Sequence, residues 1–236
     1  MRRKILFAVW LLVPVALLAY HYGPGQLRLA QDRAALKIAE AKAFEAKEDW
    51  ASAYRLWGEA LAGTPAEQPA ARFQIRLAQA RTRIQMGGLP EAMEDLTSLL
   101  DEAVQAKADA NLQNEIRGSL ASSQYYAAWL MRLEGSPGEE WMPPAESARQ
   151  NFRLLAENTK GAKMAEDYEK NLEAVIRLQR MSLEDLQGQP LPKNCSGCKN
   201  VGQKCRSQCQ SKAKSEPEKQ KDARGAGFND IPKGGS

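Results

Sequence analysis

The four cysteines of the chain are the residues best suited to chemistry, and all of them lie within fifteen residues. They are Cys195, Cys198, Cys205 and Cys209, with the spacing C-x2-C-x6-C-x3-C. Three structures fit this cluster: two disulfides, a zinc ion held by four thiolates, or an iron–sulfur cluster. Free or redox-active thiols are a further alternative. Haem attachment is excluded, because Lys199 follows Cys198 where that motif requires histidine.

The choice between disulfides and metal depends on the compartment of this segment. An oxidising compartment and an even number of cysteines favour two disulfides, whose pairing the sequence does not fix. The short spacing within each pair suits chelation of zinc, and nearby cations would offset the charge of a zinc tetrathiolate. These cations are Lys193, Lys199, Lys204 and Arg206. The six-residue central spacer is shorter than that of a zinc ribbon, so we expect no cofactor and keep zinc as the alternative.

The rest of the chain carries no catalytic constellation. His21 is the only histidine, which excludes histidine-based triads and sites with several histidine ligands. The carboxylate pairs Glu94-Asp95 and Asp101-Glu102 fall on polar helix faces, where solvation is the simpler interpretation. Gly87-Gly88 lacks the spacing and the preceding strand of a phosphate-binding loop. We therefore expect a protein that is not an enzyme and has no small-molecule substrate.

The body of the chain is predicted to consist of helices. From Gln26 to about Leu186 the apolar spacing is helical, β-branched residues are rare, and no alternating stretch of strand length occurs. Four helix boundaries are predicted. A helix starts at Thr64-Pro-Ala-Glu67, and a turn lies at Gly87-Gly88-Leu-Pro90. A longer loop runs from Gly135-Ser-Pro-Gly138 to Pro143-Pro144, and Ser182-Leu-Glu-Asp185 caps a last helix. The fold class is therefore expected to be all-α.

Two stretches 39 residues apart share one pattern of small and large side chains. The aligned positions are Trp50 with Leu89, Ala53 with Ala92, Trp57 with Leu96, and Ala60-Leu61 with Leu99-Leu100. The pattern resembles the tetratricopeptide (TPR) repeat, a helix-turn-helix unit of about 34 residues. Residues 34–67 fit one unit, with Ala41 and Phe44 in its first helix, although Glu40 departs from the usual leucine. The resemblance implies a TPR-like array of antiparallel helix pairs.

In such an array the first helix of each pair would line a concave groove for a protein or peptide partner. The positions that the resemblance assigns to this groove are Ile38, Lys42 and Glu45 in the first unit and Leu77, Arg81 and Ile84 in the second. Lys42 aligns with Arg81, and together they would suit an acidic peptide or a carboxylate end. A merely solvated face is the simpler alternative for both cations. Trp50 and Trp57 are expected to anchor the core.

The N-terminal residues predict a signal anchor. Arg2, Arg3 and Lys4 precede sixteen apolar residues, and His21 and Tyr22 extend the uncharged stretch to eighteen. A helix of that length reaches about 27 Å, close to the roughly 30 Å of a bilayer core. A cleaved secretory signal is the alternative, but the cleavage pattern before residue 20 is poor. The basic start predicts a single-pass protein of the cytoplasmic (inner) membrane whose C-terminal part is periplasmic or otherwise extracytoplasmic.

Composition divides the chain into four segments: residues 1–25 as the anchor and transmembrane helix, 26–188 as the TPR-like domain, 189–212 as the Cys-rich segment, and 213–236 as a disordered tail. Residues 189–236 hold ten Lys/Arg against four Asp/Glu, so the net charge of +4 arises in the tail and no nucleic-acid partner is expected. The predicted function is a membrane-anchored scaffold or adaptor for a partner protein. The alternative is a metal-binding or thiol-redox protein that acts through the cysteine segment.

Overall fold

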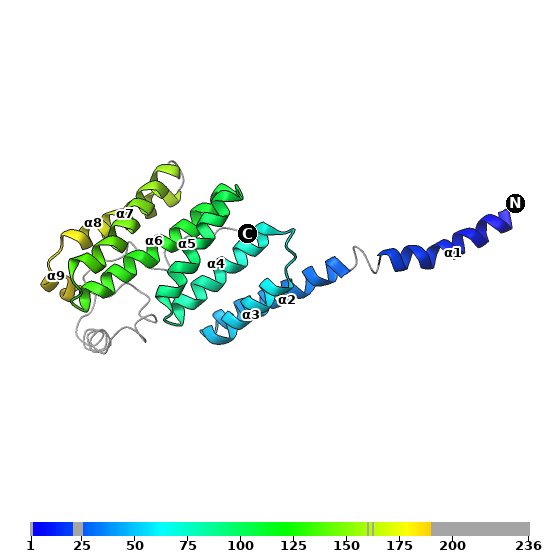
Figure 1. Ribbon diagram of the computed structural model, residues 1–236, viewed down its shortest axis with the longest axis horizontal. Helices are drawn as coiled ribbons and strands as arrows, with labels where there is room; N and C mark the ends of the chain where they lie inside the picture. Colours follow the sequence, from blue (N-terminus) through cyan, green and yellow to red (C-terminus); the bar gives the residue numbers. More distant parts are fainter. Residues whose placement is uncertain (1, 21–25, 160, 162, 190–236) are drawn as a thin grey trace. The chain divides into compact units, whose positions relative to one another are not determined.

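The computed structural model describes residues 2–20, 26–159, 161 and 163–189, and in these ranges every regular element is an α-helix. The helices are α1 (Arg2–Tyr20), α2 (Gln26–Glu45), α3 (Trp50–Gly63), α4 (Pro69–Gln85), α5 (Leu89–Gln105), α6 (Ala110–Leu133), α7 (Gly138–Asn158), α8 (Lys163–Arg180) and α9 (Leu183–Gly188) (Figure 1). The expected all-α class is confirmed. The chain divides into two compact units, Met1–Ile75 and Arg76–Ser236, and the division falls within α4.

Helix α1 does not support the predicted membrane anchor. It spans 19 residues, of which the first three are charged, so its uncharged part is the sixteen residues from Ile5 to Tyr20. Among the described residues, no helix is both long enough and apolar enough for a membrane crossing. This finding overturns the predicted single-pass anchor in the cytoplasmic membrane and, with it, the argument for a periplasmic location.

Side-chain caps fix several of the helix ends. Asp49 accepts a hydrogen bond from the backbone N–H of Ser52 at 3.1 Å and begins α3. Asp109 caps α6 in the same way through the N–H of Asn111 at 2.9 Å. The predicted cap at Ser182 is confirmed, because its hydroxyl oxygen accepts from the N–H of Asp185 at 3.1 Å. Each cap satisfies a backbone donor that the helix leaves unpaired in its first turn.

Two of the predicted boundaries are wrong. Thr64 does not begin a helix: it ends α3, and its hydroxyl donates to the carbonyl of Ala60 at 2.7 Å. Arg72 donates to the carbonyls of Leu61 at 3.1 Å and Thr64 at 2.8 Å, so the side chain of one helix satisfies the end of another. Pro143 and Pro144 were expected in a loop but lie within α7. Both prolines lie beyond the first turn, so each removes one hydrogen bond from the interior of α7.

The connections between paired helices repeat at the 39-residue spacing. Glu48 and Gly87 both adopt the left-handed conformation, with φ of 58° and 90°. After each of them, the next residue donates its N–H to a carbonyl five residues earlier: Asp49 to Phe44 at 3.0 Å, and Gly88 to Arg83 at 3.0 Å. This is the hydrogen bond of a Schellman motif, and the same residue then becomes the N-cap of the following helix. Both turns therefore reverse the chain by the same local geometry.

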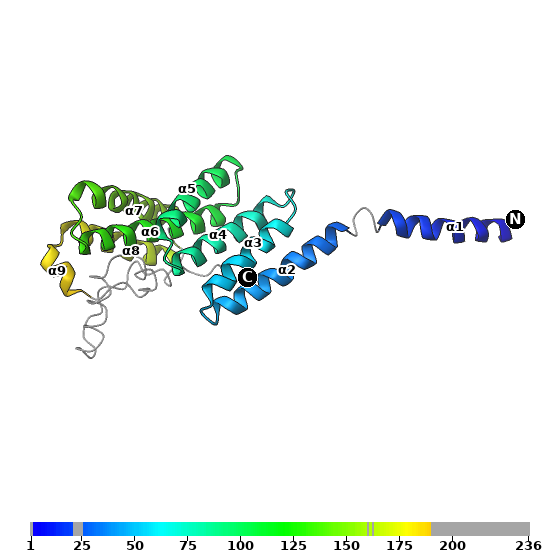
Figure 2. The ribbon, with the colours of Figure 1, turned by 60° about the horizontal axis from the view of Figure 1, so that its bottom comes forward.

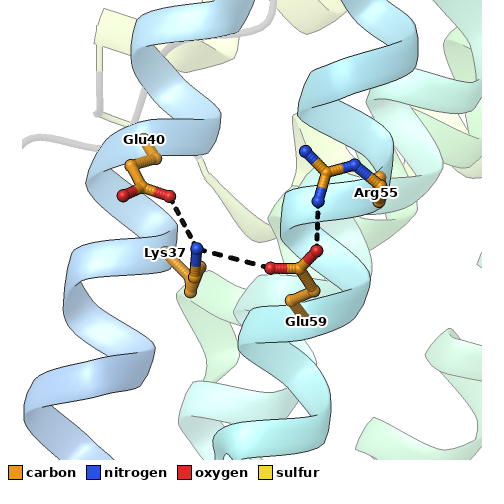
Figure 3. Close-up of polar contacts among 4 residues, drawn as sticks. All are labelled: Lys37, Glu40, Arg55 and Glu59. Atoms are coloured by element: carbon orange, nitrogen blue, oxygen red, sulfur yellow. Dashed lines mark hydrogen bonds and ion pairs between the residues drawn. The ribbon is translucent and has the colours of Figure 1, made fainter.

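The first unit is held together by the pairing of α2 with α3. Small side chains at the contact, Ala41, Ala53 and Ala60, are fully buried, which lets the two helices approach closely. The indole N–H of Trp57 donates to a carboxylate oxygen of Glu45 at 2.8 Å, which joins the buried ring of α3 to α2. On the outer side of the pair, Lys37 bridges Glu40 at 2.9 Å and Glu59 at 3.4 Å, and Glu59 also pairs with Arg55 (Figure 3).

The second unit packs α6 against α5 and α7, and α7 against α8, so helices that follow one another in the chain lie side by side (Figures 1 and 2). Its core contains Phe152 and Leu155 of α7 and Tyr168 and Val175 of α8, all at most 1% exposed. Arg132, near the end of α6, donates to the carbonyls of Leu178 and Met181 and lies 4.4 Å from the ring centre of Trp141. A single guanidinium thus joins the ends of α6 and α8 to the start of α7.

Candidate functional site

The residues that were predicted to do chemistry lie outside the part of the chain that the structure describes. This holds for Cys195, Cys198, Cys205 and Cys209. His21, the histidine that was not expected to be catalytic, lies outside the described residues as well. Within the described ranges, no group of three or more His, Cys, Asp or Glu side chains is placed to hold a metal ion. The four cysteines therefore remain a prediction from the sequence, and the structural site must be sought among the helices.

In the first unit, the three predicted groove residues have different surroundings. Lys42 is exposed, Ile38 is half-buried, and Glu45 is half-buried and accepts the hydrogen bond from Trp57. Glu45 therefore has a structural role in joining α2 to α3. Only Lys42 is exposed in the way that a groove residue needs to be.

In the second unit, two of the three predicted groove residues are part of the core. Leu77 is 2% exposed and Ile84 is 4% exposed, so neither side chain reaches a partner at the surface. The apolar spacing that suggested a groove in α4 instead marks the side of the helix that packs inward. Arg81 is different, because its side chain is 28% exposed and lies against α6.

Arg81 belongs to a polar cluster contributed by three helices, which we name the Arg81 cluster: Arg81 of α4, Glu115 and Ser119 of α6, and Tyr168 of α8. The guanidinium Nε donates to Ser119 Oγ at 2.9 Å, and Nη2 lies 4.0 Å from Glu115 Oε2. Ser119 in turn donates to the backbone carbonyl of Glu115 at 3.0 Å. Arg81 and Glu115 are each a little more than a quarter exposed, so one edge of the cluster is open to solvent.

Tyr168 forms the buried side of the cluster. Its ring is 1% exposed and rests against Gly118, where an added Cβ would lie 3.4 Å from the tyrosine hydroxyl. A glycine at this point lets α8 approach α6 closely. Burial raises the pKa of Tyr168, the charge of Glu115 raises this pKa further, and Arg81 opposes both. The phenol therefore stays neutral at physiological pH.

The Arg81 cluster is equipped for binding and lacks the parts needed for nucleophilic catalysis. Ser119 accepts from Arg81 and donates to a backbone carbonyl, so no general base takes its proton. A half-open guanidinium beside a carboxylate offers both donors and an acceptor to a polar segment of a partner. Sequence reasoning identified Arg81 but missed Glu115 and Tyr168. The signal that was available was the run of small residues around Gly118, which marks a close approach of another helix.

Comparisons of the chain with protein-family models, with curated proteins and with solved structures find no match. The class of the protein is therefore defined by its own structure: an all-helical chain whose paired helices repeat a common turn, with a polar cluster on three of the helices in the second unit.

Proposed function

We propose that the chain is a TPR-like scaffold that binds a protein or peptide partner, and that the Arg81 cluster is part of the binding surface. The repeated turns at Glu48 and Gly87 support the TPR-like interpretation. The buried pairs Ala53 with Ala92 and Trp57 with Leu96 support it as well, because they occupy the aligned positions of the two repeats.

The single observation that carries the binding role is the position of the Arg81 cluster. In a TPR-like array the first helix of each pair lines the inner surface, and α4 and α6 are first helices in this scheme. Arg81, Glu115 and Ser119 lie on these two helices and are joined by direct contacts. Polar side chains that are half-covered and held in place by neighbours lose little conformational freedom when they bind a partner.

The test is capture of a partner by the purified full-length chain, with the partner identified by mass spectrometry after chemical cross-linking. We expect Arg81→Gln to weaken binding by roughly tenfold or more, as for loss of a charged hydrogen bond at an interface. Arg153→Gln is the matched control, because Arg153 lies on α7 and pairs with Glu157 at 3.0 Å in an exposed position. Equal binding by both variants, or equal loss in both, would contradict the proposal.

A second candidate function is metal binding or thiol redox chemistry by the four-cysteine segment. The observation that favours it is the gathering of every cysteine of the chain into one short stretch. Two disulfides and a zinc site are both compatible with this spacing of cysteines. Intact mass with and without reductant distinguishes them. Two disulfides remove one hydrogen atom from each cysteine, whereas stoichiometric zinc that is lost in Cys195→Ser indicates a metal site.

A further inference from the structure

Helices α8 and α9 form a groove at the end of the second unit. It has a volume of about 790 Å³, and we name it the α8–α9 groove. Ile176 and Met181 provide apolar surface within it. Its charged residues are the carboxylates of Glu173, Glu184 and Asp185 together with the guanidinium groups of Arg177 and Arg180. The groove therefore combines an apolar surface with an excess of negative charge.

A small recess between α6 and α8 adjoins the groove and shares Arg177, Met181 and Gln189 with it. Trp129 and Tyr125 of α6 line this recess. Trp129 is 3% exposed, and its indole N–H has no hydrogen-bond partner among the described residues. An indole nitrogen can only donate, so this buried group requires an acceptor such as a backbone carbonyl.

The segment that follows Gln189 is suited to this place. Gln189 lines both the groove and the recess, and the chain continues from it as Pro190-Leu191-Pro192-Lys193. Proline restricts the backbone to an extended conformation whose carbonyls are not used by a helix, which lowers the entropic cost of docking. Residues 190–215 contain six Lys/Arg and no Asp/Glu, which complements the acidic excess of the groove.

We propose that residues 190–193 dock into the α8–α9 groove, with Leu191 against Ile176 and Met181 and Lys193 facing Glu184 and Asp185. The covalent connection at Gln189 makes the contact intramolecular, so even a weak interaction is highly populated. Because Cys195 follows two residues after Lys193, docking would hold the four-cysteine segment at this end of the helical domain. Whatever chemistry the cysteines perform would then take place beside α8 and α9.

Photo-cross-linking of the full-length chain tests the position of the segment. With p-benzoylphenylalanine in place of Leu191, we expect cross-links within one chain to Ile176 or Met181. The same photoreactive residue in place of Phe228, far along the tail, is the control. A mixture of isotope-labelled and unlabelled protein separates contacts within one chain from contacts between two copies. Cross-links to a second copy, to other helices, or to the groove equally from both positions would overturn the proposal.

Charge reversal tests the electrostatic part of the proposal. We expect Lys193→Glu to speed hydrogen exchange of the amides of α9 by roughly two- to fivefold, as for the loss of an exposed ion pair. The double variant Lys193→Glu with Glu184→Lys should restore the slower exchange. Lys219→Glu makes the same change of charge further along the tail and should leave α9 unaffected. If Lys219→Glu acts as strongly as Lys193→Glu, or if the double variant gives no rescue, the docked position of Lys193 is excluded.

Discussion

Tyr168 brings together burial, charge and close packing at a single side chain. Its hydroxyl is buried between α6 and α8 and has no hydrogen-bond partner among the described residues. Ser122 and Asn171 are likewise buried without a partner for one side-chain oxygen. Such groups cost stability, because they lose their bonds to water and gain no replacement. They distinguish this part of the second unit from an ordinary apolar core.

Removal of the Tyr168 hydroxyl should therefore not destabilise the protein. We expect Tyr168→Phe to leave the free energy of unfolding unchanged or to raise it by up to about 1 kcal/mol, because the ring keeps its packing and a buried orphan group is deleted. Urea unfolding followed by circular dichroism measures the difference. A loss of more than about 1 kcal/mol would mean that the hydroxyl has a hydrogen-bond partner that stabilises the native state.

The lowered pKa of Glu146 predicts how the stability of the protein depends on pH. Hydrogen bonds from Arg149, followed by those from Gln150 and Gln179, lower the pKa of Glu146 from 4.5 to about 2. A carboxylate whose pKa is lower in the folded state contributes stability above its unfolded pKa and loses it as the pH falls toward the folded pKa. We expect the stability of the natural chain to fall between about pH 4.5 and pH 2, and Glu146→Gln to reduce that fall.

The size of the effect at Glu146 should be modest, because its side chain is 40% exposed and solvent screens the interaction. Urea midpoints measured across this pH range for both proteins provide the comparison. If the two proteins lose stability in parallel, the hydrogen bonds of Glu146 do not contribute to folding. Gln179 lies on α8, so the same variant also reports on the contact between α7 and α8.

Among the helices, the features that local sequence determines were predictable. The repeat of small and large residues located Trp50 and Leu89 at the starts of α3 and α5, and the cap at Ser182 began α9 as expected. Thr64 was misassigned, because its hydroxyl bonds backward to Ala60 and the next helix begins only at Pro69. A threonine followed by proline gives the same local signal at the end of one helix as at the start of the next.

Substitutions at the two left-handed turn positions, Glu48 and Gly87, are expected to change the stability of the protein in opposite directions. Glu48→Gly should stabilise the protein by about 0.5–1 kcal/mol, because a side chain in this conformation is strained and glycine is not. Gly87→Ala should destabilise it by about 1 kcal/mol or more for the same reason. Thermal unfolding of the two variants measures the changes. Shifts of the same sign would show that the two turns are not equivalent.

At the scale of the whole molecule, contacts between distant elements were the part that the sequence did not reveal. Arg81 meets Ser119 across 38 positions, and Tyr168 meets Gly118 across about fifty, so no local pattern connects them. The spacing rule that identified helix α4 could not tell an exposed side from a buried one, and Leu77 and Ile84, which were expected in a groove, are buried. The N-terminal anchor was predicted from composition alone, and among the described residues no helix is long and apolar enough to cross a membrane.

The division into two units predicts that damage in one will spread little into the other. Trp57 anchors the first unit and Phe152 the second, and each is at most 3% exposed. Replacement of either by alanine should cost about 3–5 kcal/mol, because it leaves a cavity in a packed core. In stacked helical arrays, stability is largely a sum of local and nearest-neighbour interactions. We therefore expect Trp57→Ala to speed hydrogen exchange mainly in α2 and α3, and Phe152→Ala mainly in α6 to α8, as measured by mass spectrometry of peptic fragments. If either variant accelerates exchange equally in both units, the chain unfolds as one cooperative body and the two units are not independent in stability.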